Sequence, residues 1–182
     1  MLILVVGPSG AGKDTVLDGA RVRLAGDPRF RFVRRAVTRP AAAGGEDHEA
    51  ITEAEFDRRV AAGGFSISWR AHGLGYGVPA DIGETIARNV VAVVNGSRTR
   101  IDAAAALFPT RVIEITASPE MLAQRLAARG REPAGDISER LARTIALPDA
   151  AVDTIRNDGC VTAAVDRFVA VLNRAAESMR RS

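Results

Sequence analysis

The sequence contains a single cysteine, Cys160, and therefore has no second thiol for an intramolecular disulfide. This excludes a disulfide framework and any metal site made of several cysteines. Long hydrophobic runs are also missing, since the opening run Met1–Val6 ends at Gly7 and is too short for a signal peptide or a membrane-spanning helix. We therefore expect a cytoplasmic protein, in a reducing compartment, with no membrane partner.

Aromatic residues and lysine are scarce as well. Aromatic side chains make up 4% of the sequence, and Lys13 is the only lysine in a chain whose net charge is +3. The other basic residues are arginines, which suit phosphorylated ligands. A nucleic-acid surface would also need aromatic side chains on which bases stack. We expect a small phosphorylated partner and no nucleic acid, while the sequence does not indicate the oligomeric state.

The length of 182 residues predicts one domain, residues 1–182, that is large enough to bury a core. Apolar runs that are typical of buried strands alternate with segments of helical periodicity, which predicts an α/β fold with a parallel sheet and helices on both faces. The predicted strands are residues 2–6, 30–37, 65–69, 90–94, 111–116 and 152–155. The predicted helices are residues 13–25, 52–62, 81–89, 97–107, 118–129, 137–146 and 162–179, and residues 72–77 are predicted to form a glycine-rich turn.

The first strand, turn and helix match a phosphate-binding loop. The segment Gly7–Lys13 fits the pattern G-x-x-x-x-G-K and lies between a strand and a helix, as this motif requires. Its backbone amides and the helix N-terminus attract phosphate, and the Lys13 ammonium bridges the β- and γ-phosphates. We therefore predict an ATP-dependent phosphotransferase. The residues expected to bind the nucleotide are Gly7, Pro8, Ser9, Gly10, Ala11, Gly12, Lys13, Asp14 and Thr15.

The eighth position of the motif departs from the pattern. Asp14 stands where a serine or threonine hydroxyl usually binds Mg²⁺, and the next residue is Thr15. Asp14 either binds or orients Mg²⁺, directly or through water, or is only a favourable residue in the first turn of a helix. A carboxylate beside a triphosphate is unfavourable unless a cation lies between them, which favours the metal-linked interpretation. The predicted strand 90–94 ends in Asn95 without the usual acid, which also favours it.

The middle of the chain resembles the acceptor-binding insert of guanylate kinases. The matching segments are Arg35-Ala36-Val37-Thr38-Arg39-Pro40, Gly45-Glu46-Asp47-His48, Phe56, Ser68-Trp69 and Tyr76-Gly77. Arg125 to Glu132 resembles the start of that family's lid, and Asn157-Asp158 its turn near the nucleotide. The resemblance implies a P-loop NTPase fold with a parallel five-stranded sheet flanked by helices. It implies a core of residues 1–33, 90–127 and 147–182, an insert of about 34–89 and a lid of about 128–146.

Several departures from guanylate kinases affect recognition of the base. Ser68 replaces the base-reading glutamate, Val78 replaces a serine or threonine, His48 replaces a phosphate-binding tyrosine, and Ala42 replaces a second arginine. A site that recognises a base by hydrogen bonds loses discrimination when these partners are absent. The resemblance therefore predicts the fold and the phosphoryl chemistry without guanine recognition.

The same substitutions occur in ribose 1,5-bisphosphate phosphokinases of phosphonate catabolism, which the chain resembles over nearly its whole length. The shared segments are Gly7–Asp14, Thr38-Arg39-Pro40, His48, Ser68-Trp69, Tyr76-Gly77-Val78, Asn95-Gly96-Ser97-Arg98, Arg129-Gly130-Arg131-Glu132 and Asn157-Asp158-Gly159. This resemblance implies ATP-dependent phosphorylation of the 1-phosphate of ribose 1,5-bisphosphate, with Mg²⁺, to give 5-phosphoribosyl 1-diphosphate. The acceptor is a phosphate whose second pKa is about 6, so the transfer needs cations and no general base.

The expected roles follow from both resemblances. The residues expected to act in catalysis are Lys13, Asp14, Arg39, Arg129 and Arg131. The residues expected to bind the acceptor are Arg35, Arg39, His48, Ser68, Tyr76 and Asn95, and Arg125 and Asn157 are expected to join the nucleotide site. Two alternatives remain open at this point: a guanylate kinase with an altered base site, and a guanylate kinase-like interaction module without catalysis.

Overall fold

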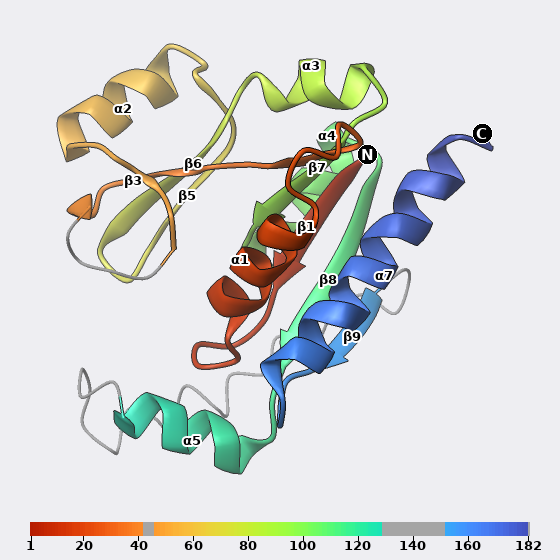
Figure 1. Ribbon diagram of the computed structural model, residues 1–182. Coiled ribbons are helices and arrows are strands. Elements are labelled where there is room, and N and C mark those ends of the chain that lie inside the picture. The colour runs from red at the N-terminus through yellow and green to blue at the C-terminus, as the bar shows by residue number, and fades with distance from the viewer. Residues whose placement is uncertain (42–45, 129–151, 182) are drawn as a thin grey trace.

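The computed structural model describes residues 1–41, 46–128 and 152–181, which form two sheets with their helices (Figure 1). The larger sheet has the strand order β2-β7-β1-β8-β9, and every neighbouring pair in it is parallel. Its strands are β1 (Leu2–Val6), β2 (Phe30–Phe32), β7 (Val91–Asn95), β8 (Thr110–Thr116) and β9 (Val152–Arg156). The predicted parallel five-stranded sheet is therefore confirmed.

Helices cover both faces of this sheet because the central strand is apolar on both sides. Ile3 and Val5 of β1 belong to one buried cluster, which is shared with α1 (Lys13–Arg23) and α7 (Val161–Met179). The alternate residues of β1 belong to a second cluster, shared with α3 (Ile82–Ala87) and α4 (Ile101–Leu107). A short 3₁₀ helix, Arg98–Arg100, precedes α4, and α5 (Pro119–Ala128) follows β8. Within the described residues, no helix is long and apolar enough to cross a membrane.

The smaller sheet has the order β4-β3-β6-β5 and lies with α2 to one side of the larger sheet (Figure 1). Its elements are β3 (Ala36–Val37), β4 (Glu49–Ala50), α2 (Glu53–Ala61), β5 (Phe65–Ala71) and β6 (Leu74–Pro79). β6 pairs antiparallel with β3 and β5, whereas β3 and β4 are parallel. Trp69 and Ile67 of β5 belong to the same buried cluster as Leu2 and Leu4 of β1, so the two sheets share part of the core.

Two sequence-based expectations about this sheet are wrong. The predicted single strand 30–37 is two strands, because the chain leaves the large sheet after Phe32 and enters the small one at Ala36. The predicted turn 72–77 is confined to His72 and Gly73, and Leu74–Pro79 is a strand. Position 77 of this strand requires glycine, because a Cβ there would overlap the ring of Phe65 on the neighbouring strand.

Candidate active site

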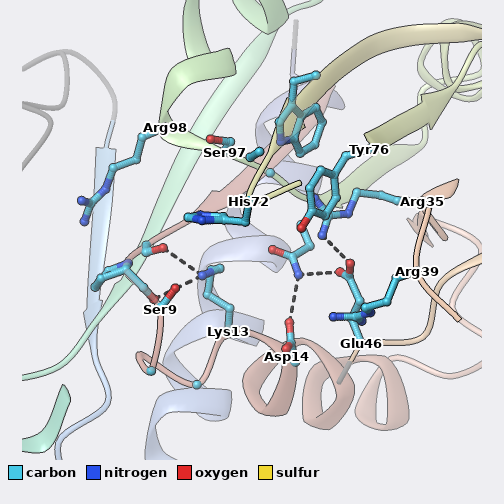
Figure 2. A pocket seen from close by; sticks show the side chains of 18 of the residues that line it. Ser9, Lys13, Asp14, Arg35, Arg39, Glu46, His72, Tyr76, Ser97 and Arg98 are labelled. Carbon is cyan, nitrogen blue, oxygen red and sulfur yellow. Dashed lines mark hydrogen bonds and ion pairs between the residues drawn. The ribbon is translucent and has the colours of Figure 1, made fainter. Parts of the chain in front are cut away.

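A cavity of about 380 Å³ lies at the carboxyl ends of β1 and β7, where the two sheets meet. Parallel α/β sheets place their ligand sites at this edge. The phosphate loop lines one side of it and the small sheet the other (Figure 2). Its lining residues are Gly7, Pro8, Ser9, Gly10, Gly12, Lys13, Asp14, Arg35, Arg39, Glu46, Trp69, Ala71, His72, Tyr76, Asn95, Gly96, Ser97, Arg98 and Leu126.

The phosphate loop has the backbone shape that its sequence predicts. Gly7 and Gly12 have φ angles of 148° and 83°, a region that other residues avoid. A Cβ at Gly7 would overlap the carbonyl oxygen of Ile115, and one at Gly12 would lie 2.5 Å from Nδ2 of Asn157. Both positions therefore require glycine for conformation and for close packing.

The side chain of Lys13 lines the cavity (Figure 2). Its Nζ donates hydrogen bonds to the carbonyl oxygens of Gly7 (2.8 Å) and Pro8 (3.3 Å). Burial lowers the pKa of Lys13 from 10.5 to about 8; Asp14 and Glu46 oppose this shift, whereas Arg35 and Arg98 add to it. A bound polyanion would favour the charged ammonium and raise this pKa again.

Arg125 and Asn157 support the phosphate loop from behind and do not line the cavity. Asn157 is 2% exposed, and its Nδ2 donates to the carbonyl oxygen of Ala11 at 2.8 Å. Arg125 donates to the backbone oxygen of Asn157 at 2.8 Å and to those of Gly10 and Ala11 at 3.4 Å. These contacts fix the shape of the loop. The remaining predicted nucleotide residues outside the cavity lining are Ala11, which is buried, and Thr15, which is exposed.

A chain of hydrogen bonds joins the small sheet to the phosphate loop. An Arg35 guanidinium nitrogen donates to Oε1 of Glu46 at 2.5 Å. Asn95 Nδ2 donates to Oε2 of Glu46 at 2.7 Å and to Oδ1 of Asp14 at 2.9 Å. The dashed lines in Figure 2 follow this chain past Asp14, Glu46 and Arg35. Asp14 and Asn95 are thus in contact, although they lie far apart in the sequence.

An aromatic pair holds the Arg35 side chain. The rings of Trp69 and Tyr76 are stacked, with centroids 5.2 Å apart and an interplanar angle of 10°. The Arg35 guanidinium lies 5.3 Å from the centroid of Trp69 and 5.0 Å from that of Tyr76. Burial raises the pKa of Tyr76, so its hydroxyl stays protonated at neutral pH and can donate a hydrogen bond.

Arg39 lines the cavity, whereas His48 lies behind it. His48 is 4% exposed, and its ring nitrogens contact the backbone oxygens of Glu46 (2.9 Å) and Arg39 (3.0 Å). It therefore links Arg39 to the segment that carries Glu46. Ser68 also lies outside the lining, since it neighbours Trp69 in β5 and successive strand side chains point to opposite faces.

Sequence reasoning gave no role to two charged residues of the cavity, Glu46 and Arg98. Arg98 donates to Oε1 of Glu114 at 2.5 Å, and both side chains are largely buried. Each residue belongs to a segment that carries a family resemblance, but no local motif gives either one a chemical role. The predicted catalytic residues Arg129 and Arg131 lie outside the described residues, as do Ala42, Gly45 and the predicted helix 137–146.

The charges of the cavity suit phosphorylated ligands. Its described lining contains Lys13 and three arginines against two carboxylates, those of Asp14 and Glu46. The described residues include no group of three or more His, Cys, Asp or Glu that could hold a metal alone. Mg²⁺ usually takes one or two protein carboxylates and completes its shell with phosphate oxygens and water, so Asp14 fits a Mg²⁺ that arrives with a nucleotide.

Comparison with curated proteins finds close relatives over most of the chain. It is 46% identical over 177 residues to the ribose 1,5-bisphosphate phosphokinase PhnN of Brucella melitensis, covering 96% of this chain and 92% of that protein. It is 53% identical over 173 residues to the protein of the same name from Methylobacterium radiotolerans, covering 94% and 96%. A scan against protein-family models finds no match.

Among solved structures, the guanylate kinase of Anaplasma phagocytophilum has a similar fold. The TM-score is 0.67 at 16% sequence identity, covering 97% of this chain and 86% of the guanylate kinase. At this identity the likeness concerns the fold alone. It confirms the predicted guanylate kinase-like α/β fold.

Proposed function

The chain belongs to the ribose 1,5-bisphosphate phosphokinase family, and from this we propose that it transfers the γ-phosphoryl group of ATP to the 1-phosphate of ribose 1,5-bisphosphate. An oxygen of the 1-phosphate forms a bond to the γ-phosphorus while the bond to the β,γ-bridging oxygen breaks. The products are 5-phosphoribosyl 1-diphosphate and ADP. One observation carries the proposal: a single cavity brings Lys13 of the phosphate loop together with Arg35 and Arg39 of the acceptor side.

The described residues supply what this transfer needs. The acceptor phosphate is mostly a dianion at pH 7, so no residue has to remove a proton from it. Two polyanions must instead be held close together, which requires fixed positive charge. We assign Lys13 to the transferring phosphoryl group and Arg35 and Arg39 to the acceptor phosphates. Tyr76 donates from its protonated hydroxyl, and Arg125 and Asn157 keep the loop in shape.

We further propose that the small sheet and α2 form the acceptor-binding insert, within about residues 34–89. The lid of about residues 128–146, with Arg129 and Arg131, remains a proposal that rests on the resemblance of its sequence. ATP as the donor and the single exposed Cys160 both suit the cytoplasm, which is ATP-rich and reducing.

Asp14 is proposed to hold Mg²⁺ or one of its water ligands, and Mg²⁺ would supply charge neutralisation for the transferring group. In Asp14→Asn we expect the Mg²⁺ concentration for half-maximal activity to rise about tenfold. The enzyme–ADP complex should also bind Mn²⁺ more weakly, as measured by electron paramagnetic resonance. Asp18→Asn is the matched control, since Asp18 lies one turn further along α1 and outside the main cavity. An unchanged metal dependence in Asp14→Asn would mean that Asp14 does not bind the metal and is only a favourable residue in the first turn of α1.

The acceptor distinguishes this function from its alternatives. We expect kcat/KM for ribose 1,5-bisphosphate to exceed that for GMP at least about a thousandfold, because Ser68 stands in place of the base-reading glutamate and lies outside the described cavity lining. ADP release with either acceptor measures this ratio. Robust turnover of GMP alone would make the protein a guanylate kinase. Failure to bind ATP–Mg²⁺ in calorimetry would indicate a module without catalysis.

A further inference from the structure

Glu46 is a carboxylate in the middle of a cavity that is built for anions. Its side chain is 14% exposed, and its two oxygens accept hydrogen bonds from Arg35 and Asn95 at 2.5 and 2.7 Å. It belongs to the same cavity lining as Tyr76 and Arg39 (Figure 2). A negative charge at this place repels any phosphate that enters, so its presence needs an explanation.

Arg35 has contacts in addition to its ion pair with Glu46. The guanidinium also lies against the stacked rings of Trp69 and Tyr76, with centroids 5.3 and 5.0 Å away. Arg35 is 6% exposed, and its Nε is buried without a hydrogen-bond partner among the described residues. Nε of Arg39 is buried and unpartnered in the same way. The two guanidinium groups thus have donor capacity that the described protein groups leave unused.

A buried arginine without a counter-ion is strongly unfavourable, because its charge is removed from water without compensation. The Glu46 carboxylate supplies this compensation when no ligand is bound. A phosphate dianion carries more charge and more acceptor oxygens than a carboxylate, and it can use the donors that Glu46 leaves unused. The carboxylate that it replaces still has its hydrogen bond from Asn95.

We propose that Glu46 is an internal counter-ion on the anion site of Arg35, which the acceptor phosphate replaces on binding. Glu46 thereby sets acceptor affinity and selects against ligands that bring less than a dianion. That the anion is a sugar phosphate rests on the proposed function, whereas the exchange itself concerns any phosphate. Glu46 is thus a specificity-determining residue that acts through Arg35.

Other roles for Glu46 predict a different outcome when its charge is removed. If the carboxylate only stabilised the fold, Glu46→Gln would lower stability and leave phosphate affinity unchanged. If it accepted hydrogen bonds from the hydroxyl groups of a sugar, the same variant would leave inorganic phosphate unaffected and weaken the sugar phosphate. Of these three roles, only the counter-ion role predicts tighter binding of phosphate itself.

The experiment compares Glu46→Gln with the wild type, using inorganic phosphate as the probe in calorimetry. We expect phosphate to bind about tenfold more tightly to the variant, because a negative charge next to the ligand is removed. The ligand-free variant should also have a lower Tm, and saturating phosphate should raise it by more than in the wild type. Unchanged or weaker phosphate binding would overturn the proposal, and Glu46→Ala provides a second variant with the same expectation.

Two further variants provide a control and test whether Glu46 acts through Arg35. Asp47→Asn removes the neighbouring carboxylate, which is 53% exposed and paired with Arg34, and phosphate affinity should stay within twofold of the wild type. In an Arg35→Gln background, addition of Glu46→Gln should give a much smaller gain, since only the direct repulsion between the Glu46 carboxylate and phosphate then remains. A tenfold gain in phosphate affinity without Arg35 would contradict the proposal that Glu46 acts through Arg35. Turnover of GMP in place of the sugar phosphate would refute the proposed function and leave this binding test intact.

Discussion

Replacement of Lys13 by methionine is expected to lower kcat/KM at least about a thousandfold, which corresponds to roughly 4 kcal/mol of transition-state stabilisation. Lys13 is the only lysine of the chain and lines the cavity, at the end of the glycine-rich loop. Methionine keeps most of the length of the side chain and removes the charge that faces the transferring phosphoryl group. Steady-state release of ADP measures the loss.

The same variant should remain folded. Burial lowers the pKa of Lys13 to about 8, so the folded protein disfavours the charged form that the unfolded chain keeps up to about pH 10.5. The charge therefore reduces stability at neutral pH, and this penalty fades as the pH rises from about 8 through 10.5. We expect the Tm of Lys13→Met at pH 7 to equal or exceed that of the wild type. A collapsed Tm would mean that the lost activity reflects unfolding.

Proton uptake provides an independent readout for Lys13. At pH 8.5 a large part of Lys13 is neutral in the free enzyme, and a bound triphosphate raises its pKa. Binding of ATP–Mg²⁺ to the wild type should therefore take up protons, which calorimetry in buffers of different ionisation enthalpy detects. Lys13→Met should lack this contribution. Equal uptake by both proteins would mean that Lys13 does not meet the nucleotide phosphates.

The sequence predicted correctly those elements whose formation depends on residues adjacent in the chain. The strand Leu2–Val6, the phosphate loop and the start of α1 at Lys13 follow from adjacent residues, and each lies where the motif predicts. The capping of α2 by Thr52 is also local, and the Thr52 hydroxyl accepts a hydrogen bond from the Glu55 amide at 3.1 Å. Parallel pairing of the large sheet follows from the alternation of strands and helices.

Long-range packing determined what the sequence could not predict. The sequence of residues 30–37 contains no glycine or proline that would mark a break, and only the pairing partners show that β2 and β3 belong to different sheets. Gly75 and Gly77 suggested a turn, yet they serve the close approach of two phenylalanine rings across β5, β6 and α2. In the cavity, motif residues such as Asp14 and Arg39 were predicted, whereas Glu46 became visible only through its contacts with Arg35 and Asn95.

Replacement of Arg39 by methionine is expected to lower kcat/KM about 100- to 1000-fold, mainly through a higher KM for the acceptor. Arg39 lines the cavity, and its Nε is buried without a partner in the described part of the chain. His48 fixes the backbone of Arg39 through a 3.0 Å contact to its carbonyl oxygen. A guanidinium nitrogen of Arg39 also lies 3.4 Å from Nδ1 of His48, so the group is held at the cavity with a donor that the described residues leave unused. Initial rates at varied acceptor concentration separate KM from kcat.

Arg34→Met is the matched control for Arg39, because it removes the same type of side chain five positions earlier in the same segment. Arg34 is 57% exposed, pairs with Asp47 at 2.9 Å, donates to the carbonyl oxygen of His48 at 2.9 Å and does not line the cavity. Exposed ion pairs contribute little, so activity and Tm should stay close to those of the wild type. If Arg34→Met and Arg39→Met lost activity equally, the general positive charge of this segment would matter and the position of the Arg39 guanidinium would not. A loss confined to Arg39 with an unchanged KM for ATP would assign this guanidinium to the acceptor phosphate.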